Sequence, residues 1–105
     1  MDSENEIYKV RITDECIEEI EQIYDYIANE LKANNSAVKL IKEVRTKILG
    51  LSKTPKLYPK INKRNRAKKI YRRIIIQNYI VLYTVDDNQK LVYISHMHFS
   101  RKKYL

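Results

Sequence analysis

Two histidines near the C-terminal end, His96 and His98, are the residues of this chain best suited to proton transfer. They are two positions apart, so on an extended strand both side chains point to the same face. Histidine changes its charge near neutral pH, which suits His98 to general acid–base catalysis or to a hydrogen bond near a basic surface, with a purely structural role as the alternative. The pair could also ligate zinc, but the sequence offers no evident third ligand, so we predict neither a metal site nor a cofactor.

Two adjacent arginines, Arg72 and Arg73, are the candidate anion-binding residues. Neighbouring residues of a strand point to opposite faces, so one guanidinium should lie on the exposed side of a sheet and the other near an edge. Guanidinium groups bind phosphate or carboxylate through two parallel hydrogen bonds, which favours an anion clamp. The alternative is that both side chains are simply solvated.

The basic side chains are concentrated in one part of the chain. The formal charge is +8, yet residues 1–34 carry three basic and ten acidic side chains, whereas residues 53–73 carry ten Lys or Arg and no acid. Because this run lies between apolar segments, we expect a folded surface to display it, where its field attracts polyanions or an acidic protein. The members that we predict to bind a nucleic acid or another target are Arg66, Lys68, Lys69, Arg72 and Arg73.

The sequence ends in a second basic segment, residues 100–105. One interpretation is a mobile tail, since chain termini fray. The other is that Arg101 and Tyr104 complete a surface with Arg73 and His98, where tyrosine stacks on a base and arginine holds the neighbouring phosphate. If the chain cleaves RNA, these four residues are the predicted catalytic set, and Arg101 also belongs to the predicted binding residues.

Length and composition narrow the class of protein. A chain of 105 residues has the size of one domain, so we predict a single domain over residues 1–105, with residues 1–6 flexible. The one cysteine, Cys16, excludes a disulfide framework, and its acidic neighbours favour a buried, unreactive thiol. The apolar runs are too short to cross a membrane, and a single glycine excludes a glycine-rich phosphate loop. We therefore expect a soluble, cytoplasmic protein.

The first half of the chain has the pattern of one strand and two helices. Residues 7–12 alternate as a strand does, and Thr13 or Asp14 can cap a following helix over residues 14–33. A short polar break separates it from a second helix over residues 36–52, which predicts an antiparallel helical hairpin. The first apolar stripe consists of Ile17, Ile20, Ile23 or Tyr24, Ile27 and Leu31. The second consists of Ala37, Leu40, Ile41, Val44, Ile48 and Leu51.

The second half has the hydrophobic period of strands. The three predicted strands, rich in Ile, Val and Tyr, are residues 70–77, 79–86 and 91–99. Residues 79–85 are apolar on both faces, which predicts a central strand. A basic loop, residues 52–67, leads to these strands and should be held by Leu57, Tyr58 and Ile61. The predicted fold is α+β: an N-terminal strand, an antiparallel helical hairpin and a three-stranded antiparallel meander.

The order of these elements, together with three stretches of sequence, resembles the RelE/ParE superfamily of toxins from bacterial type II toxin–antitoxin modules. The stretches are residues 71–74 (Tyr-Arg-Arg-Ile), residues 79–86 (Tyr-Ile-Val-Leu-Tyr-Thr-Val-Asp) and residues 92–98, which run into the basic–aromatic ending. Each is degenerate alone, but their order and spacing together are specific. The resemblance covers the chain from about Ile7 to Tyr104.

The resemblance implies a toxin that a cognate acidic antitoxin neutralises. Members similar to RelE cut messenger RNA on the ribosome, whereas members similar to ParE have longer paired helices and act on DNA gyrase. The two long predicted helices are closer to the ParE-like branch. Two departures from the cleaving members agree with this. The chain has Ile80 where those members commonly carry a basic residue. They often also use a carboxylate after the second helix, whereas residues 52–85 contain none.

We therefore predict a toxin that arrests growth by inhibiting an essential nucleic-acid-handling target, with gyrase as the precedent. Two alternatives stay open. One is a ribosome-dependent messenger-RNA endoribonuclease of the RelE type, and the other is a non-toxic nucleic-acid-binding relative whose basic loop only holds a partner. The predicted partners are thus an acidic antitoxin and either gyrase or the ribosome with its messenger.

Overall fold

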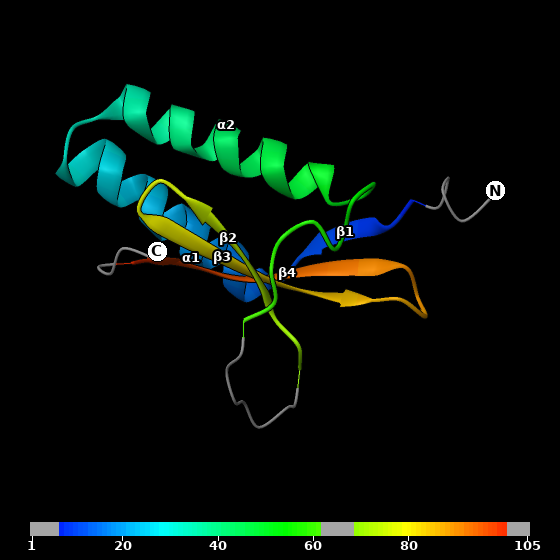
Figure 1. The fold of residues 1–105 in the computed structure, drawn as a ribbon. Coiled ribbons are helices and arrows are strands. Elements are labelled where there is room, and N and C mark those ends of the chain that lie inside the picture. The colour runs from blue at the N-terminus through cyan, green and yellow to red at the C-terminus, as the bar shows by residue number, and fades with distance from the viewer. Residues whose placement is uncertain (1–6, 62–68, 101–105) are drawn as a thin grey trace.

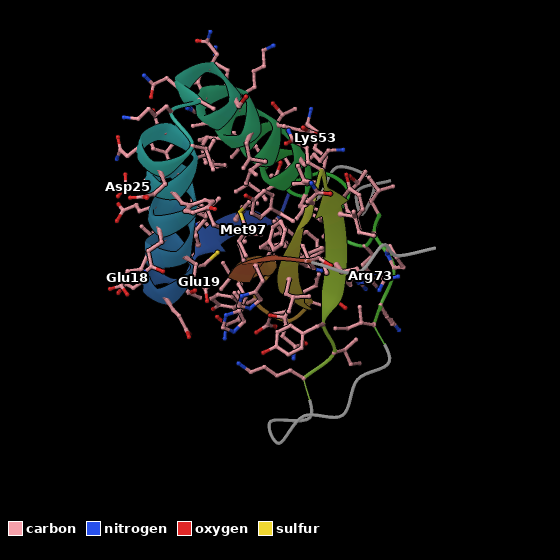
Figure 2. The ribbon with its side chains drawn as sticks, turned by 90° about the vertical axis from the view of Figure 1, so that its left-hand side faces the viewer. Glu18, Glu19, Asp25, Lys53, Arg73 and Met97 are labelled. Atoms are coloured by element: carbon pink, nitrogen blue, oxygen red, sulfur yellow. The ribbon has the colours of Figure 1, made fainter. Side chains whose placement is uncertain are left out.

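A computed structural model describes residues 7–61 and 69–100. In chain order its elements are β1 (Lys9–Ile12), α1 (Asp14–Asp25), the π-helix η2 (Tyr26–Glu30), α2 (Asn34–Gly50), β2 (Arg72–Ile76), β3 (Tyr79–Asp86) and β4 (Leu91–Phe99). The strands form one sheet in the order β1-β4-β3-β2, in which β1 is parallel to β4 and the other pairs are antiparallel. The helices lie on one side of this sheet (Figures 1 and 2). The predicted α+β fold and order of elements are confirmed.

The first helix begins where the sequence predicts, but its apolar stripe is only partly right. The Thr13 hydroxyl caps α1 by accepting the Cys16 amide N–H at 3.1 Å. Cys16 and Ile27 are buried, whereas Ile17 and Leu31 are 41% and 56% exposed, contrary to the prediction. The reason is a change of phase: Cys16 takes the buried position at the start, and the wider turn of η2 rotates the residues that follow it.

The second helix starts at Asn34, two residues before the predicted start. Lys32 adopts a left-handed backbone conformation, with a φ of 53°, and this reverses the chain between the two helices. The N-cap residue of α2, Ala33, makes no side-chain cap hydrogen bond. The predicted stripe is confirmed by five of its members, which are buried: Ala37, Leu40, Val44, Ile48 and Leu51.

The segment after α2 covers the outer edge of β2. The Arg73 amide donates to the Pro59 carbonyl at 3.1 Å, and the Ile61 amide donates to the Tyr71 carbonyl at 2.9 Å. Tyr58 packs against the core as predicted, but Leu57 is 64% exposed and does not hold the loop. This pairing protects the edge of the sheet from other chains. In the described residues, no helix combines the length and apolar character that a membrane span needs.

The strands β3 and β4 match their predicted bounds, and β3 lies in the interior of the sheet as expected. Their pairing contains a β-bulge. Tyr83 pairs with Ile94 and Leu82 with His96, so Ser95 is an extra residue in β4. One extra residue exchanges the two faces of a strand. Ile94 and Met97 are therefore buried, and the residues that alternate with Met97 point away from the core.

The first helix continues the edge contact that β1 begins. β1 pairs with residues 91–94 of β4, and Thr13 then donates its amide N–H to the Ile94 carbonyl at 3.0 Å and its hydroxyl to the Ser95 carbonyl at 3.3 Å. The Met97 amide donates to Glu19 Oε1, on α1, at 3.0 Å. The side chains of Thr13, at the N-cap of α1, and Glu19, within α1, thus satisfy backbone groups of β4 that a longer β1 would have paired.

Replacing Thr13 with alanine should reveal how much this edge contact contributes. Thr13→Ala removes the helix cap and the hydrogen bond to Ser95, so we expect the free energy of unfolding to fall by about 1–2 kcal/mol. Urea denaturation measures it. Thr46→Ala is the matched control, because the exposed Thr46 hydroxyl only bonds the Lys42 carbonyl of its own helix. Equal stability of the two variants would contradict the assigned role.

Candidate functional site

The face of the sheet that the helices leave open carries the candidate site. Arg73, Leu82 and His96 lie in one row across β2, β3 and β4. Ile75, Ile80 and His98 form the next row. Since neighbouring strands are about 4.8 Å apart, β3 separates the Arg73 backbone from the His96 position by about 10 Å, and His98, one row further along, is more distant still. Arg73 and His98 therefore share a face without being adjacent.

A carboxylate from α1 reaches both histidines. Glu19 Oε2 lies 3.4 Å from His96 Nδ1 and 4.0 Å from His98 Nδ1. The two imidazole rings are stacked, with centroids 5.3 Å apart and planes inclined by 18°. The other Glu19 oxygen, Oε1, accepts the Met97 amide, so the carboxylate is held by the backbone of β4. Figure 2 shows Glu19 directed toward this end of the sheet, while Glu18 points away from it.

Glu19 is a site residue that was not predicted from the sequence, although its position in α1 carries a signal. Glu19 lies three residues after Cys16 and four before Ile23, so it falls within the apolar stripe rather than on the polar face of α1. A carboxylate in such a position must find a partner in the fold. What the sequence could not reveal is that the partners are His96 and His98.

Arg72 points to the same side of β2 as the buried Ile74 and helps to fix the loop. Its Nη1 donates to the Tyr58 carbonyl at 2.7 Å and to the Lys56 carbonyl at 3.3 Å. The buried Tyr83 hydroxyl donates to the Pro55 carbonyl at 2.8 Å and fixes the same loop. As predicted from their adjacent positions, Arg72 and Arg73 point to opposite faces of β2, and Arg72 uses part of its guanidinium inside the fold.

The charged side chains are segregated on the molecule. Glu18 and Asp25 lie on the outer side of α1, whereas Lys53 and Arg73 lie on the other side of the molecule (Figure 2). Lys69 is exposed beside β2. Four predicted site residues lie outside the described part of the chain: Arg66, Lys68, Arg101 and Tyr104.

Cys16 is not a nucleophile. Its side chain is buried, and this burial, with smaller contributions from Glu19 and Glu15, raises the pKa of the thiol to about 12. A thiol with such a pKa carries almost no thiolate at neutral pH. The prediction of a buried, unreactive cysteine agrees with this environment.

An open groove of about 790 Å³ adjoins the histidines. It runs between α1 with η2 on one side and the start of β3 and the end of β4 on the other. Its lining is mainly apolar and includes Ile23, Tyr26, Tyr79 and Phe99, with His98 at one side. The site thus combines an imidazole–carboxylate cluster, a cationic residue across the sheet and an apolar groove.

Sequence comparison decides the family. The family model described as "ParE toxin of type II toxin-antitoxin system, parDE" matches residues 10–99. The chain belongs to the ParE toxin family. No curated protein sequence shows a significant match to it. The ParE match agrees with the predicted RelE/ParE resemblance, and the chain is a toxin of the type II toxin–antitoxin class.

Three solved structures share the fold of this ParE-family chain. The chromosomal ParDE system from P. aeruginosa aligns with a TM-score of 0.72 and 12% identity, covering 92% of this chain and 100% of that one. The RelBE2 toxin–antitoxin complex from Mycobacterium tuberculosis gives 0.61 and 18%, with coverages of 89% and 98%. The archaeal RelE–RelB complex from Pyrococcus horikoshii OT3 gives 0.56 and 15%, with coverages of 92% and 99%. At these identities the likeness concerns the fold.

The structural role of Arg72 in this ParE-family toxin can be tested by measuring the stability of a variant. Arg72→Ala should lower the free energy of unfolding by about 1.5–3 kcal/mol, because two carbonyl groups lose a charged donor. Chemical denaturation measures the change. Arg45→Ala, on the exposed surface of α2, is the control and should stay within about 0.5 kcal/mol of the parent. An Arg72→Ala protein as stable as the parent would show that the loop does not depend on this contact.

Proposed function

We propose that this ParE-family toxin arrests growth by binding an essential nucleic-acid-handling target, with DNA gyrase as the family precedent. The observation that supports binding over cleavage is the separation of Arg73 from the histidines by a whole strand. The binding residues of this proposal are, besides Arg73, those predicted from sequence: Arg66, Lys68, Lys69, Arg72 and Arg101. Arg101 and Tyr104 are proposed as catalytic residues only for the nuclease alternative.

The separation matters because of what phosphodiester cleavage requires. A base must reach the attacking 2′-hydroxyl while a cation contacts the phosphate, both within hydrogen-bond distance of the reacting atoms. The Arg73 and His96 backbones are about 10 Å apart across the sheet, and Leu82 and Ile80 occupy the intervening strand. The side chains of Arg73 and His96 would have to extend toward each other over Leu82 to meet at one phosphate, which favours binding over cleavage.

The second part of the proposal is a cognate antitoxin with an acidic segment. The relatives from P. aeruginosa and M. tuberculosis are described as toxin–antitoxin systems or complexes. This chain has a formal charge of +8, with Lys53, Lys60, Lys69 and Arg73 among its described basic residues. The apolar groove beside β4 offers a place for non-polar side chains of such a segment.

Antitoxin binding should depend on salt mainly through the rate of association. Attraction between a basic toxin and an acidic segment speeds encounter and is screened as ionic strength rises. In stopped-flow mixing with a candidate antitoxin, a short acidic protein sought among the products of neighbouring genes, we expect the association rate constant to fall at least tenfold between 50 and 500 mM salt (about 14 Å to 4 Å of screening length). The dissociation rate should change little. Failure of any such protein to bind or to restore growth would contradict the proposal.

One observation favours a second candidate function. Glu19, which lies outside the segment that lacks carboxylates, stands beside His96 and His98. An imidazole next to a carboxylate can serve as a general base. This supports a ribosome-dependent endoribonuclease of the RelE type as the alternative.

Paired variants distinguish the two functions. For a binding inhibitor, His98→Ala should leave growth arrest nearly unchanged, whereas Arg73→Ala should weaken target binding by about 1.5–3 kcal/mol through loss of charge-assisted contacts. For a nuclease, His98→Ala should reduce cleavage by about 10²–10⁴-fold. Profiles of RNA ends and of gyrase-linked DNA breaks after induction provide the measurement. Ribosomal messenger cleavage that His98→Ala abolishes would overturn the proposal, and absence of any growth arrest would identify a non-toxic relative.

A further inference from the structure

We propose that Glu19, His96 and His98 form a binding site for a divalent transition metal ion such as Zn²⁺. Each residue offers one ligand atom, and these atoms all lie within 4.8 Å of one another. Two imidazoles and one carboxylate are a ligand set that zinc accepts in proteins, with a fourth position left for water or another ligand. This inference corrects the expectation from sequence that the histidine pair lacks a third ligand.

The distance from Glu19 to His96 already fits a shared ion, whereas the other ligand atoms, all within 4.8 Å of one another, need side-chain rotation to converge because the two imidazole planes are nearly parallel. With bonds of about 2.0–2.1 Å, a tetrahedral zinc ion holds its ligand atoms about 3.3–3.4 Å apart. Glu19 Oε2 is 3.4 Å from His96 Nδ1, which matches that spacing but is long for a hydrogen bond. The 4.0 Å distance to His98 Nδ1 needs a small rotation, for which the 54% exposed side chain has room.

The carboxylate is already oriented for this role. Glu19 Oε1 accepts the Met97 amide at 3.0 Å, so Oε2 is the oxygen presented to the two histidines. Metal-binding carboxylates are commonly held by such a second hydrogen bond. The bulge at Ser95 orients the imidazoles, because it places both of them on the outward face of β4.

The site is also accessible. Glu19 and His98 line the groove between the helical segment and the ends of β3 and β4. The remaining coordination position of a bound ion could therefore be reached from solvent. In addition, the sequence contains two histidines and one cysteine, and Cys16 is buried, so imidazole-based zinc binding elsewhere in this chain is not possible.

Titration of the full chain, produced without a histidine tag, tests the proposal with the metal alone. Isothermal titration calorimetry with ZnCl₂ should show one saturable site per chain, and MgCl₂ should show none because Mg²⁺ prefers oxygen ligands. Co²⁺ in place of Zn²⁺ should give the strong visible absorption of a four-coordinate ion. Zn²⁺ at 100 times its dissociation constant should shift the folding equilibrium about 100-fold toward the folded state.

Two variants and one control make the test specific. Glu19→Gln keeps an oxygen for the Met97 amide but loses the charge, and His98→Asn changes an exposed side chain, so both should fold. Each should weaken Zn²⁺ binding at least tenfold and lose the cobalt absorption. Glu18→Gln is the matched control and should bind as the parent does. Absence of a saturable site in the parent, or equal affinity in all four proteins, would overturn the proposal.

Discussion

The difference in length between β1 and β4 is the constraint on which the rest of this structure depends. β1 has four residues and β4 has nine, so β1 covers only the first part of its neighbour. In the described part of the chain, β3 pairs with the remainder of β4 on one side, but no strand continues beside it on the side of β1. Its backbone groups still need partners. The helical segment provides them through Thr13 and Glu19, which places α1 along this edge and couples the start of the helix to the end of the sheet.

The same constraint produces the site. Glu19 is drawn to β4 because the Met97 amide needs an acceptor, and this brings its second oxygen to the outward side of the strand. Without the bulge at Ser95, the alternation that buries Val92 and Ile94 would direct the histidines toward the core. The bulge reverses it and buries Met97 instead. Helix α1, which completes the edge of β4, and the bulge at Ser95 within β4 therefore act together. Neither alone would bring the Glu19 carboxylate to the two imidazoles.

At the opposite edge, the chain protects β2 with its own basic segment. Backbone pairing with residues 59–61 and the guanidinium of Arg72 hold this segment against the sheet. The positive charge is thereby displayed beside β2 while the acidic residues lie along the outer side of α1. This segregation gives the ParE-family chain a directional electrostatic surface, which orients an approaching anionic partner and accelerates its encounter. Arg72 stabilises the fold and its neighbour Arg73 lies on the open face; the sequence predicts that the two side chains point to opposite faces, but not which of them faces the fold.

The sequence by itself determined the elements whose signal is local. The apolar stripe of α2, the bounds of β3 and β4, and the Thr13 cap depend on residues within one or two turns or strand repeats, so hydrophobic period and capping chemistry predict them. The stripe of the first helical segment was missed at both ends: Cys16 rather than Ile17 is buried at its start, and the π-helical turn of η2 changes the phase before Leu31. The tertiary structure alone decided the parallel pairing of β1 with β4, the bulge at Ser95, the meeting of Glu19 with the histidines and the inward role of Arg72. Each of these depends on backbone groups far apart in the chain finding partners, and a linear pattern carries no record of which groups remain unpaired until the sheet is assembled.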